Sequence, residues 1–319
     1  MPTPEFPAVQ PTQVDGRRVA LFLAIALGGA VVMGGLLSVA ARLIPATLTP
    51  VLTLSLAVLY MPLPMVAGFI VEQQAGRRPF LVVRAWRAVR AHPIQIAPIL
   101  LLGAGSGLAV TVVTLLVALG LSGAGVPGAG TLVISTEELA VQLGRLAGVP
   151  LPADTAAALP PVGVLVVLVV FQGIVAGATV NAVFAFGEEY GWRGVLAEEL
   201  APLGSTRAHL IIGAIWGLWH VPLIVGLGYN FGQNWLAGIP LMVTFCIPVG
   251  FVMAWAAVRA GIFGASVSHG VLNGTAPVTV LVLSGTSTLI APVGIAATLG
   301  ATGVAAALWL AFPPATSSR

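Results

Sequence analysis

Apolar residues in this chain gather into long runs, with few polar residues between them. A transmembrane helix needs about 20 mostly apolar residues to cross about 30 Å of hydrocarbon. Runs this long predict helices rather than barrel strands, because the backbone in lipid must satisfy its own hydrogen bonds. Eight runs qualify, at roughly Val19–Leu43, Val51–Val71, Ile96–Leu121, Val162–Phe186, Ala208–Leu227, Leu236–Val258, Ile262–Leu283 and Leu289–Phe312. The pattern predicts an all-α fold, a polytopic transmembrane helical bundle of about eight spans.

The composition agrees with a surface that faces lipid. Only 7% of the 319 residues are charged and 58% are apolar, whereas soluble domains carry about 25% charged residues. So few charges cannot cover a water-facing surface on a protein of this size. The single cysteine, Cys246, lies in an apolar run and has no partner for an internal disulfide.

The basic residues are all arginines, and they flank the apolar runs. If the N-terminus is cytoplasmic, eleven arginines (Arg193 among them) fall on the inner side and only Arg42 and Arg145 on the outer side. Such an excess predicts the orientation of a membrane protein, here with both termini cytoplasmic. The basic charge therefore indicates membrane topology, and we expect no nucleic-acid partner. Exclusive use of arginine suggests a GC-rich genome, and we expect a multi-pass protein of the bacterial inner (plasma) membrane.

The chain divides into four regions. Residues 1–18 form a cytoplasmic tail, and residues 286–319 hold the last span and a short cytoplasmic tail. Residues 19–160 form an N-terminal transmembrane region, and residues 161–285 form a core that carries most of the intramembrane polar residues. The N-terminal region has two long loops. The arginine-rich loop 74–94 is either a basic amphipathic helix on the inner leaflet or a simple topology signal, and the external loop 122–160 has room for a short helix.

The first cluster of polar residues in the core follows the fourth apolar run. On a helix, Glu189 and Arg193 are four positions apart and can pair, whereas Glu188 points about 100° away and stays free. Ionisable groups inside a membrane are costly and are candidates for function. A free carboxylate in an apolar wall can act as a general base. The alternative is a charge network at a helix end.

The second and third clusters supply imidazole and carboxamide groups. Trp216 and His220 share one helix face, and Pro222 loosens the backbone just after the histidine. His269 and Asn273 stand one above the other on a later helix. Each cluster alone also fits a packing histidine or an interhelical hydrogen bond. Together they supply a base, a group that orients water and donors for an oxyanion, which is what amide hydrolysis requires.

Other intramembrane chemistries lack their residues. The zinc-protease motif H-E-x-x-H is absent, and the only aspartates, Asp15 and Asp154, lie outside the predicted spans. Cys246 has no flanking base, and no glycine-rich motif suggests nucleotide binding. Glutamate chemistry remains.

These motifs resemble the CPBP family (CAAX-processing and bacteriocin-processing membrane endopeptidases, also called Abi). Glu188-Glu189-Tyr190-Gly191-Trp192-Arg193 is similar to the family's E-E-x-x-x-R motif, and His269 to Asn273 to its H-x-x-x-N motif. Trp216 to His220 resembles its aromatic-x-x-x-His motif, with Trp where many members have Phe. The resemblance covers roughly residues 160–285 and identifies the core as CPBP-like and catalytic.

The resemblance implies an intramembrane endopeptidase that hydrolyses a peptide or membrane-protein substrate with glutamate-activated water. In that family, Glu188 would activate the water, His220 would help to hold it, and His269 and Asn273 would stabilise the oxyanion. The remaining residues, Glu189, Arg193 and Trp216, would order the site.

Several alternatives stay open. No cofactor is expected, although a zinc ion held by Glu188, His220 and His269 remains an alternative. In terms of function, the alternatives are a non-catalytic membrane scaffold or bacteriocin self-immunity protein, and a proton-coupled transporter. For the protease, the interpretation expects a cavity that opens to the cytoplasm.

Overall fold

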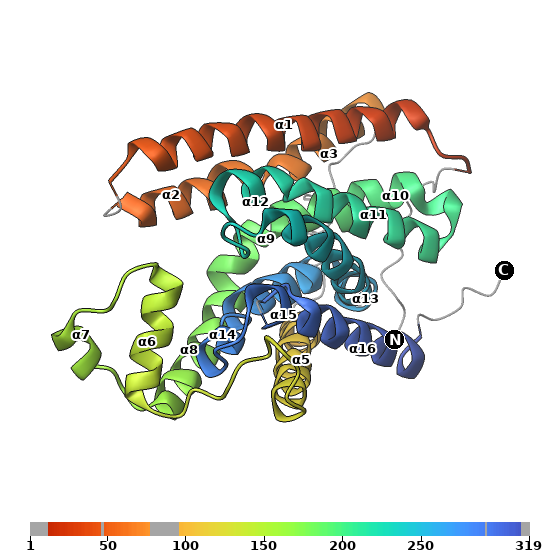
Figure 1. Ribbon diagram of the computed structural model, residues 1–319. Helices are drawn as coiled ribbons and strands as arrows, with labels where there is room; N and C mark the ends of the chain where they lie inside the picture. The colour runs from red at the N-terminus through yellow and green to blue at the C-terminus, as the bar shows by residue number, and fades with distance from the viewer. Residues whose placement is uncertain (1–11, 46–47, 77–95, 291, 314–319) are drawn as a thin grey trace.

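The computed structural model of the protein describes residues 12–45, 48–76, 96–290 and 292–313, and within these ranges it is a bundle of helices without a β-strand (Figure 1). An isolated bridge joins Leu132 and Leu283. The elements are α1 (Gly16–Leu43), α2 (Thr49–Ser55), η2 (Leu56–Tyr60), α3 (Leu63–Gln74), α5 (Ile96–Gly123), α6 (Thr136–Ala147), α7 (Ala153–Ala157), α8 (Val162–Ala176), η4 (Gly177–Asn181), α9 (Ala182–Glu189), η5 (Tyr190–Leu196), α10 (Ala197–Leu200), η6 (Ala201–Leu203), α11 (Ser205–Trp219), α12 (Val221–Leu227), α13 (Trp235–Thr275), α14 (Val278–Val282), α15 (Ser287–Ile290) and α16 (Ile295–Ala311).

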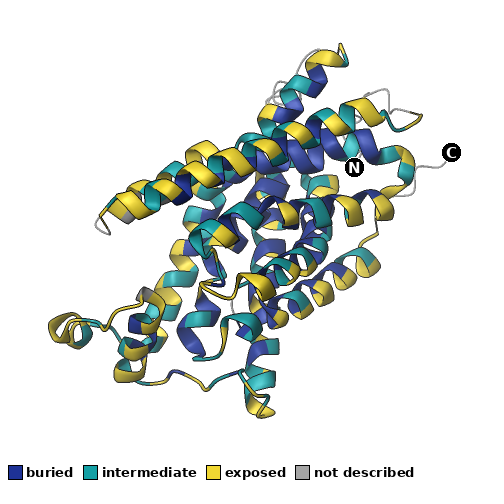
Figure 2. Ribbon diagram, turned by 45° about the horizontal axis from the view of Figure 1, so that its top comes forward, coloured by how far each residue is buried: buried dark blue, intermediate teal, exposed yellow. Residues whose placement is uncertain are grey.

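Six helical runs among the described residues are long and apolar enough to cross a membrane: Gly16–Leu43, Ile96–Gly123, Val162–Leu203, Ser205–Leu227, Trp235–Val282 and Ser287–Ala311. The predicted all-α transmembrane bundle is confirmed, and the chain is a multi-pass membrane protein. Buried residues gather in the middle of the bundle, and exposed residues follow its outer helix faces (Figure 2). The predicted number of spans differs from these six runs at two places.

The second predicted span is not one helix. Between Thr49 and Gln74 the chain forms α2, the π-helical η2 and α3, separated by a turn at Met61 and Pro62. Proline has no backbone N–H and clashes with the preceding turn, so it breaks a helix interior. The prediction of a continuous helix over Val51–Val71 is therefore wrong. The three pieces still lie along α1 (Figure 1).

The sixth and seventh predicted spans are the two arms of α13. Ala260 (φ −132°, ψ 15°) and Gly261 (φ 69°, ψ −177°) leave the helical conformation, and a positive φ suits glycine, which has no Cβ. Cys246 and Asn273 would be about 40 Å apart on a straight helix, yet both line one cavity of about 290 Å³. The chain therefore doubles back at Gly261, between the predicted span ends Val258 and Ile262.

The fourth predicted span continues far beyond Phe186. From Val162 the helical run extends through α8, η4, α9, η5 and α10 to Leu203, with two π-helical stretches. π-helical turns inside α-helices are frequent at functional sites. The first polar cluster, which was expected to follow the fourth span, therefore lies within one long helical run.

Glycines fix the second arm of α13 against its neighbours. A Cβ built at Gly177 would lie 2.5 Å from the Cα of Val271, and one at Gly274 would lie 2.4 Å from the carbonyl oxygen of Gly173. On the other side, a Cβ at Gly107 would lie 2.2 Å from the carbonyl oxygen of Ser268. Small residues four positions apart let membrane helices approach closely. The arm that carries the third cluster is held between α5 and α8–η4.

The helix ends define two faces of the bundle. We call residues 16–18, 199–207, 255–261 and 311–313 the arginine face, because they carry Arg17, Arg18, Arg207 and Arg259. Arg18 lies 3.9 Å from Glu199, and Arg259 donates a hydrogen bond to the carbonyl of Phe312 at 2.8 Å, which joins these segments at one end.

We call residues 42–43, 123–135, 227–235 and 276–290 the opposite face, which carries Arg42 in the last turn of α1. Its segments also meet, because Ser284 N donates to the carbonyl of Thr131 at 3.0 Å and Ser38 packs on Gly226. The predicted helix in the external loop is present there as α6, capped by Ser135, followed by the shorter α7. The predicted basic helix at 74–94 lies almost entirely outside the described residues.

Candidate active site

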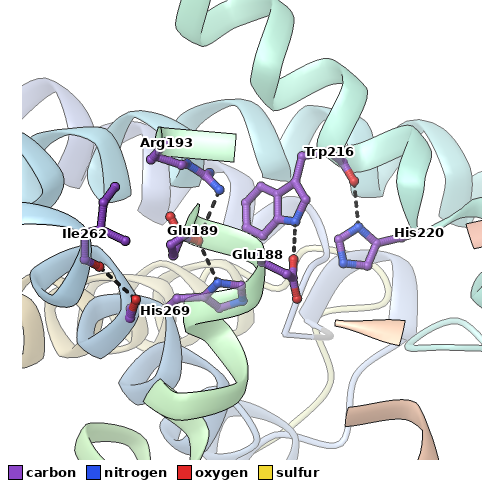
Figure 3. Close-up of polar contacts among 8 residues, drawn as sticks. Glu188, Glu189, Arg193, Trp216, His220, Ile262 and His269 are labelled. Atoms are coloured by element: carbon purple, nitrogen blue, oxygen red, sulfur yellow. Dashed lines mark hydrogen bonds and ion pairs between the residues drawn. The ribbon is translucent and has the colours of Figure 1, made fainter. Parts of the chain in front are cut away.

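The three polar clusters meet at one cavity of about 290 Å³. Its lining includes Glu188 from α9, Trp216 and His220 from α11, and His269 and Asn273 from the second arm of α13. Figure 3 shows most of these side chains converging from separate helices. The sequence hypothesis required the clusters to face a common pocket, and the structure brings all five residues to it.

The glutamate motif is shaped by its glycines and by the π-helical turn that follows it. Gly187 and Gly191 lie against the start of α3, where a Cβ at Gly191 would come within 2.5 Å of the backbone of Pro64 and one at Gly187 within 2.9 Å of the Cα of Pro62. The proline turn that interrupts the second predicted span therefore packs directly on the motif. Side chains at these two positions would push α9 and η5 away from α3.

Glu189 is the centre of a buried ion network. Its Oε1 accepts a hydrogen bond from Arg193 at 3.2 Å, and Nδ1 of His269 lies 2.8 Å from the same oxygen. The side chains of Glu189 and Arg193 are 0% and 1% exposed. The helical spacing predicted the pair with Arg193, whereas the contact with His269 was not predicted. Breaking a buried ion pair is strongly destabilising, so these three groups hold one another in fixed positions.

Glu188 has a partner that the sequence interpretation missed. The indole Nε1–H of Trp216 donates a hydrogen bond to its Oε2 at 2.7 Å, and the guanidinium of Arg193 lies over the same indole, 4.4 Å from the ring centroid. The prediction that Glu188 stays free is therefore wrong, because one of its oxygens is held by Trp216 (Figure 3). A phenylalanine at position 216, as in many members of the resembling family, could not make this bond.

His220 sits where the helix breaks. α11 ends at Trp219 and α12 begins at Val221, with Pro222 in its first turn, as the proline predicted. His220 Nδ1 lies 2.8 Å from the carbonyl oxygen of Trp216. A carbonyl only accepts hydrogen bonds, so Nδ1 carries the proton and Nε2 of the neutral ring is an acceptor. Figure 3 shows this second nitrogen on the side of Glu188.

Two tyrosines and an asparagine line the cavity although no sequence argument named them. Tyr60 donates to the carbonyl of Trp219 at 2.6 Å, Tyr229 stacks on the ring of His220 at 6.1 Å, and Asn230 follows it. The third of the chain's three tyrosines, Tyr190, belongs to the glutamate motif. Tyrosine is rare enough here that its polar hydroxyl in apolar runs was a usable signal.

The zinc alternative stays a prediction. Within the described part of the chain, no group of three His, Cys, Asp or Glu side chains is arranged to hold a metal ion. Nδ1 of His220 and of His269 each contact a protein oxygen, which leaves Nε2 of each ring as the nitrogen that could bind one. The chemistry below uses no metal ion.

The site lies well inside the bundle, away from the arginine face. Near the arginine face Glu199 meets Arg18, and further in the rings of Phe22 and Trp192 meet at 5.4 Å. Glu188 lies eleven residues before Glu199, which corresponds to about 15 Å along the helix, half of a hydrocarbon core of about 30 Å. Arg193 is buried within the same helical run, so it is not one of the loop arginines among which it was counted.

The cavity opens away from the arginine face. At its inner end Glu188 is 3% and Met253 0% exposed, whereas Tyr229 is 38% exposed, and Asn273 and Pro277 are also exposed. The exposed members border the opposite face. The expected opening of the cavity to the cytoplasm stays a prediction.

Comparisons with known proteins point to one family. Residues 160–275 match a family model described as type II CAAX prenyl endopeptidase Rce1-like. The chain is also similar to CAAX prenyl protease 2 of Methanococcus maripaludis, with 32% identity over 93 residues, 27% of this chain and 34% of that protein. The chain thus spans about a third of the length of the curated relative that it matches. All five cavity residues of the three clusters fall inside the matched segment.

Proposed function

From the match of residues 160–275 to the Rce1-like family of type II CAAX prenyl endopeptidases, we propose that the chain is an intramembrane endopeptidase whose hydrolytic water is activated by Glu188. The observation that carries the proposal is the convergence of Glu188, His220, His269 and Asn273 on one cavity. Their groups match the three tasks of amide hydrolysis: deprotonating water, orienting it and stabilising an oxyanion.

The water is bound between Glu188 and His220. Trp216 holds one oxygen of Glu188, and the other carboxylate oxygen is available to the water. Nε2 of His220 accepts a hydrogen bond from the water, since Nδ1 donates to the carbonyl of Trp216. As the water oxygen attacks the peptide carbonyl carbon, its proton passes to Glu188. The same proton then passes to the amide nitrogen as the C–N bond breaks, which leaves a carboxylic acid and an amine.

His269 and Asn273 stabilise the oxyanion. They lie one helical turn apart on the same arm, so a carbonyl oxygen can accept from both. As a protonated ring paired with Glu189, His269 donates from Nδ1 to that carboxylate and keeps Nε2–H as the donor to the substrate oxygen. Donors held in place before the reaction need no reorganisation in the transition state. Glu189 and Arg193 act only through His269 and Trp216, as positioning residues.

The substrate is a peptide or membrane protein within the bilayer. The name of the archaeal relative describes a protease for prenylated CAAX sequences, so a prenylated CAAX peptide is a reasonable first probe. A cavity buried among membrane-spanning helices suits a peptide that a lipid anchor or an apolar segment holds in the membrane.

The test is the Glu188→Gln variant, which removes the base at nearly constant volume. The purified protein in liposomes is given a fluorogenic prenylated CAAX peptide. In parallel, peptides from membranes of cells that produce either form are compared by mass spectrometry. We expect cleavage to fall by roughly 10²–10⁴-fold, with the uncleaved peptide accumulating in the variant cells.

The matched control is Glu137→Gln, which changes an exposed glutamate in the first turn of α6. It should cleave like the wild type. Unchanged cleavage by Glu188→Gln, or identical peptide sets in the two strains, would refute the proposed mechanism.

A further inference from the structure

We propose that Tyr60, in the N-terminal region, is a positioning residue for His220. Its hydroxyl holds the peptide unit that leads into His220, and this sets the gap in which the hydrolytic water is bound. The proposal rests on the proposed function for what that gap does, whereas the contacts that carry it do not depend on catalysis. Tyr60 lies outside residues 160–275, which match the family model, so the three motifs could not indicate this role.

The helix break at His220 leaves one backbone carbonyl without its helical partner. In a continuous helix, the carbonyl of Trp219 would accept a hydrogen bond from the N–H of Leu223, four residues on. Here the N–H of Leu223 donates to the carbonyl of His220 instead, at 3.0 Å. Trp219 is 1% exposed, and a buried carbonyl without a donor is costly. The break that places His220 therefore needs a donor from another part of the chain.

Tyr60 supplies this donor. Its hydroxyl donates a hydrogen bond to the carbonyl oxygen of Trp219 at 2.6 Å, across 159 positions of the sequence. Tyr60 is itself buried, and it lines the same cavity as His220. A phenolic hydroxyl stays protonated near neutral pH, so it remains a donor while the site works.

The bond acts on the side chain of His220 through the peptide plane. The carbonyl of Trp219 and the backbone nitrogen of His220 belong to one planar unit, so holding the oxygen fixes the direction in which the chain enters His220. The contact of Nδ1 with the carbonyl of Trp216 at 2.8 Å then orients the ring, with Nε2 on the side of Glu188 (Figure 3). Without the hydroxyl of Tyr60, the peptide unit can rotate towards another donor, and Nε2 moves with it.

The segment that carries Tyr60 also contacts the helix of Glu188. Tyr60 ends η2, and Pro62 lies two residues further on. A Cβ at Gly187, the neighbour of Glu188, would lie 2.9 Å from the Cα of Pro62. This short segment thus touches both helices that hold the water, and it sets the spacing between Glu188 and His220. A misplacement of about 1 Å in such a site can cost about 10²-fold in rate.

The test is Tyr60→Phe, which removes the hydroxyl and keeps the ring. Cleavage of the prenylated peptide by the protein in liposomes is measured at several peptide concentrations. We expect kcat to fall roughly tenfold and KM to change by less than about twofold, because the hydroxyl contacts the backbone and not the substrate. Replacement of Tyr60 by 4-aminophenylalanine, which keeps an N–H donor in place of the hydroxyl, should recover most of kcat.

The matched control is Trp255→Phe. This change also removes a side-chain donor to a backbone carbonyl, since Nε1 of Trp255 donates to Phe312 at 3.1 Å, but Trp255 does not line the cavity. Its kcat should match that of the wild type. An equal loss of kcat in the two variants would overturn the proposal, because general loosening of the bundle would then explain both.

A second measurement reads His220 without catalysis. Solid-state ¹⁵N NMR of histidine-labelled protein in the same liposomes reports which ring nitrogen carries the proton, and the signal is assigned by its absence in His220→Gln. We expect the proton on Nδ1 in the wild type and in Trp255→Phe, and a second tautomer in Tyr60→Phe. An unchanged His220 signal in Tyr60→Phe would overturn the proposal. Cleavage that does not depend on Glu188 would instead reject the proposed function, while the NMR signal still decides whether Tyr60 positions His220.

Discussion

The inner end and the mouth of the cavity are built in different ways. At the inner end, Glu189, Arg193, His269, Trp216 and Glu188 are joined by charge-assisted hydrogen bonds across three helices. At the mouth, the turn at residues 228–234 is shaped mainly by the backbone, with positive φ at three positions. The reacting groups are thus held rigidly before substrate arrives, as efficient sites require, whereas the rim is a loop that can vary with the substrate.

The largest effect is expected from Glu189→Gln, which removes the centre of the inner network. It leaves the guanidinium of Arg193 buried without a carboxylate and loosens His269. Breaking such a buried pair costs about 3–5 kcal/mol, and cleavage should be lost. The thermal unfolding midpoint in detergent measures the stability, with the exposed Asp154→Asn as the control.

A second change sharpens this prediction. Replacing both partners, Glu189→Gln with Arg193→Met, should recover part of the stability but none of the activity, because no buried charge is then left unpaired. If the double variant is no more stable than the single one, the network does not depend on this ion pair.

An intermediate effect is expected from Trp216→Phe. The change keeps an aromatic ring under Arg193 but removes the donor to Glu188. A hydrogen bond to a charged group contributes about 1.5–3 kcal/mol, so kcat should fall roughly 10- to 100-fold, with a small change in KM. Steady-state cleavage at several peptide concentrations measures both.

Trp219→Phe is the matched control. Its indole Nε1–H is buried and has no hydrogen-bond partner among the described residues, so its loss should leave kcat within about threefold, well below the effect of a charged hydrogen bond. Equal losses in the two variants would show that ring size, rather than the hydrogen bond to Glu188, is responsible.

The smallest effect is expected at the mouth. Asn230→Ala must hold a positive φ with an ordinary side chain, which costs about 1 kcal/mol, whereas Asn230→Gly removes that strain. The alanine variant should therefore unfold at a lower temperature than the glycine variant, with little change in the cleavage of a bound peptide. Identical unfolding midpoints of the two variants would mean that the turn can relax to avoid the strain. The rim and the inner end would then differ less in rigidity than we describe.

The sequence predicted those features that depend on local spacing. Apolar runs gave the helices, and the four-residue separation gave the pair of Glu189 with Arg193. Contacts between distant segments could not be predicted in this way. Trp216 meets Glu188 across 28 positions, and His269 meets Glu189 across 80. The grouping of polar residues in the sequence indicated a site, but it did not indicate which hydrogen bonds join them.

The end of the fourth span was mispredicted for a related reason. Hydropathy ended the fourth span at Phe186, because charged residues follow it. The structure buries Glu188, Glu189 and Arg193 within the bundle, where they satisfy one another, so the helix continues. In the sequence alone, charged residues that pair with one another inside the bundle look the same as charged residues that mark the end of a span. Likewise, Pro62 was a visible break within the second apolar run.

The glycine contacts along the second arm of α13 limit how this protein can move. Where a single methyl group does not fit between Gly177 and Val271, or between Gly274 and Gly173, neither sliding nor rolling of one helix on the other is available. These two glycine contacts hold the helices in one relative position, whereas a rocking transporter needs helix surfaces that slide past each other. Any movement that admits a peptide must therefore come from segments outside these contacts, namely the turn at 228–234 and the short helices α14 and α15.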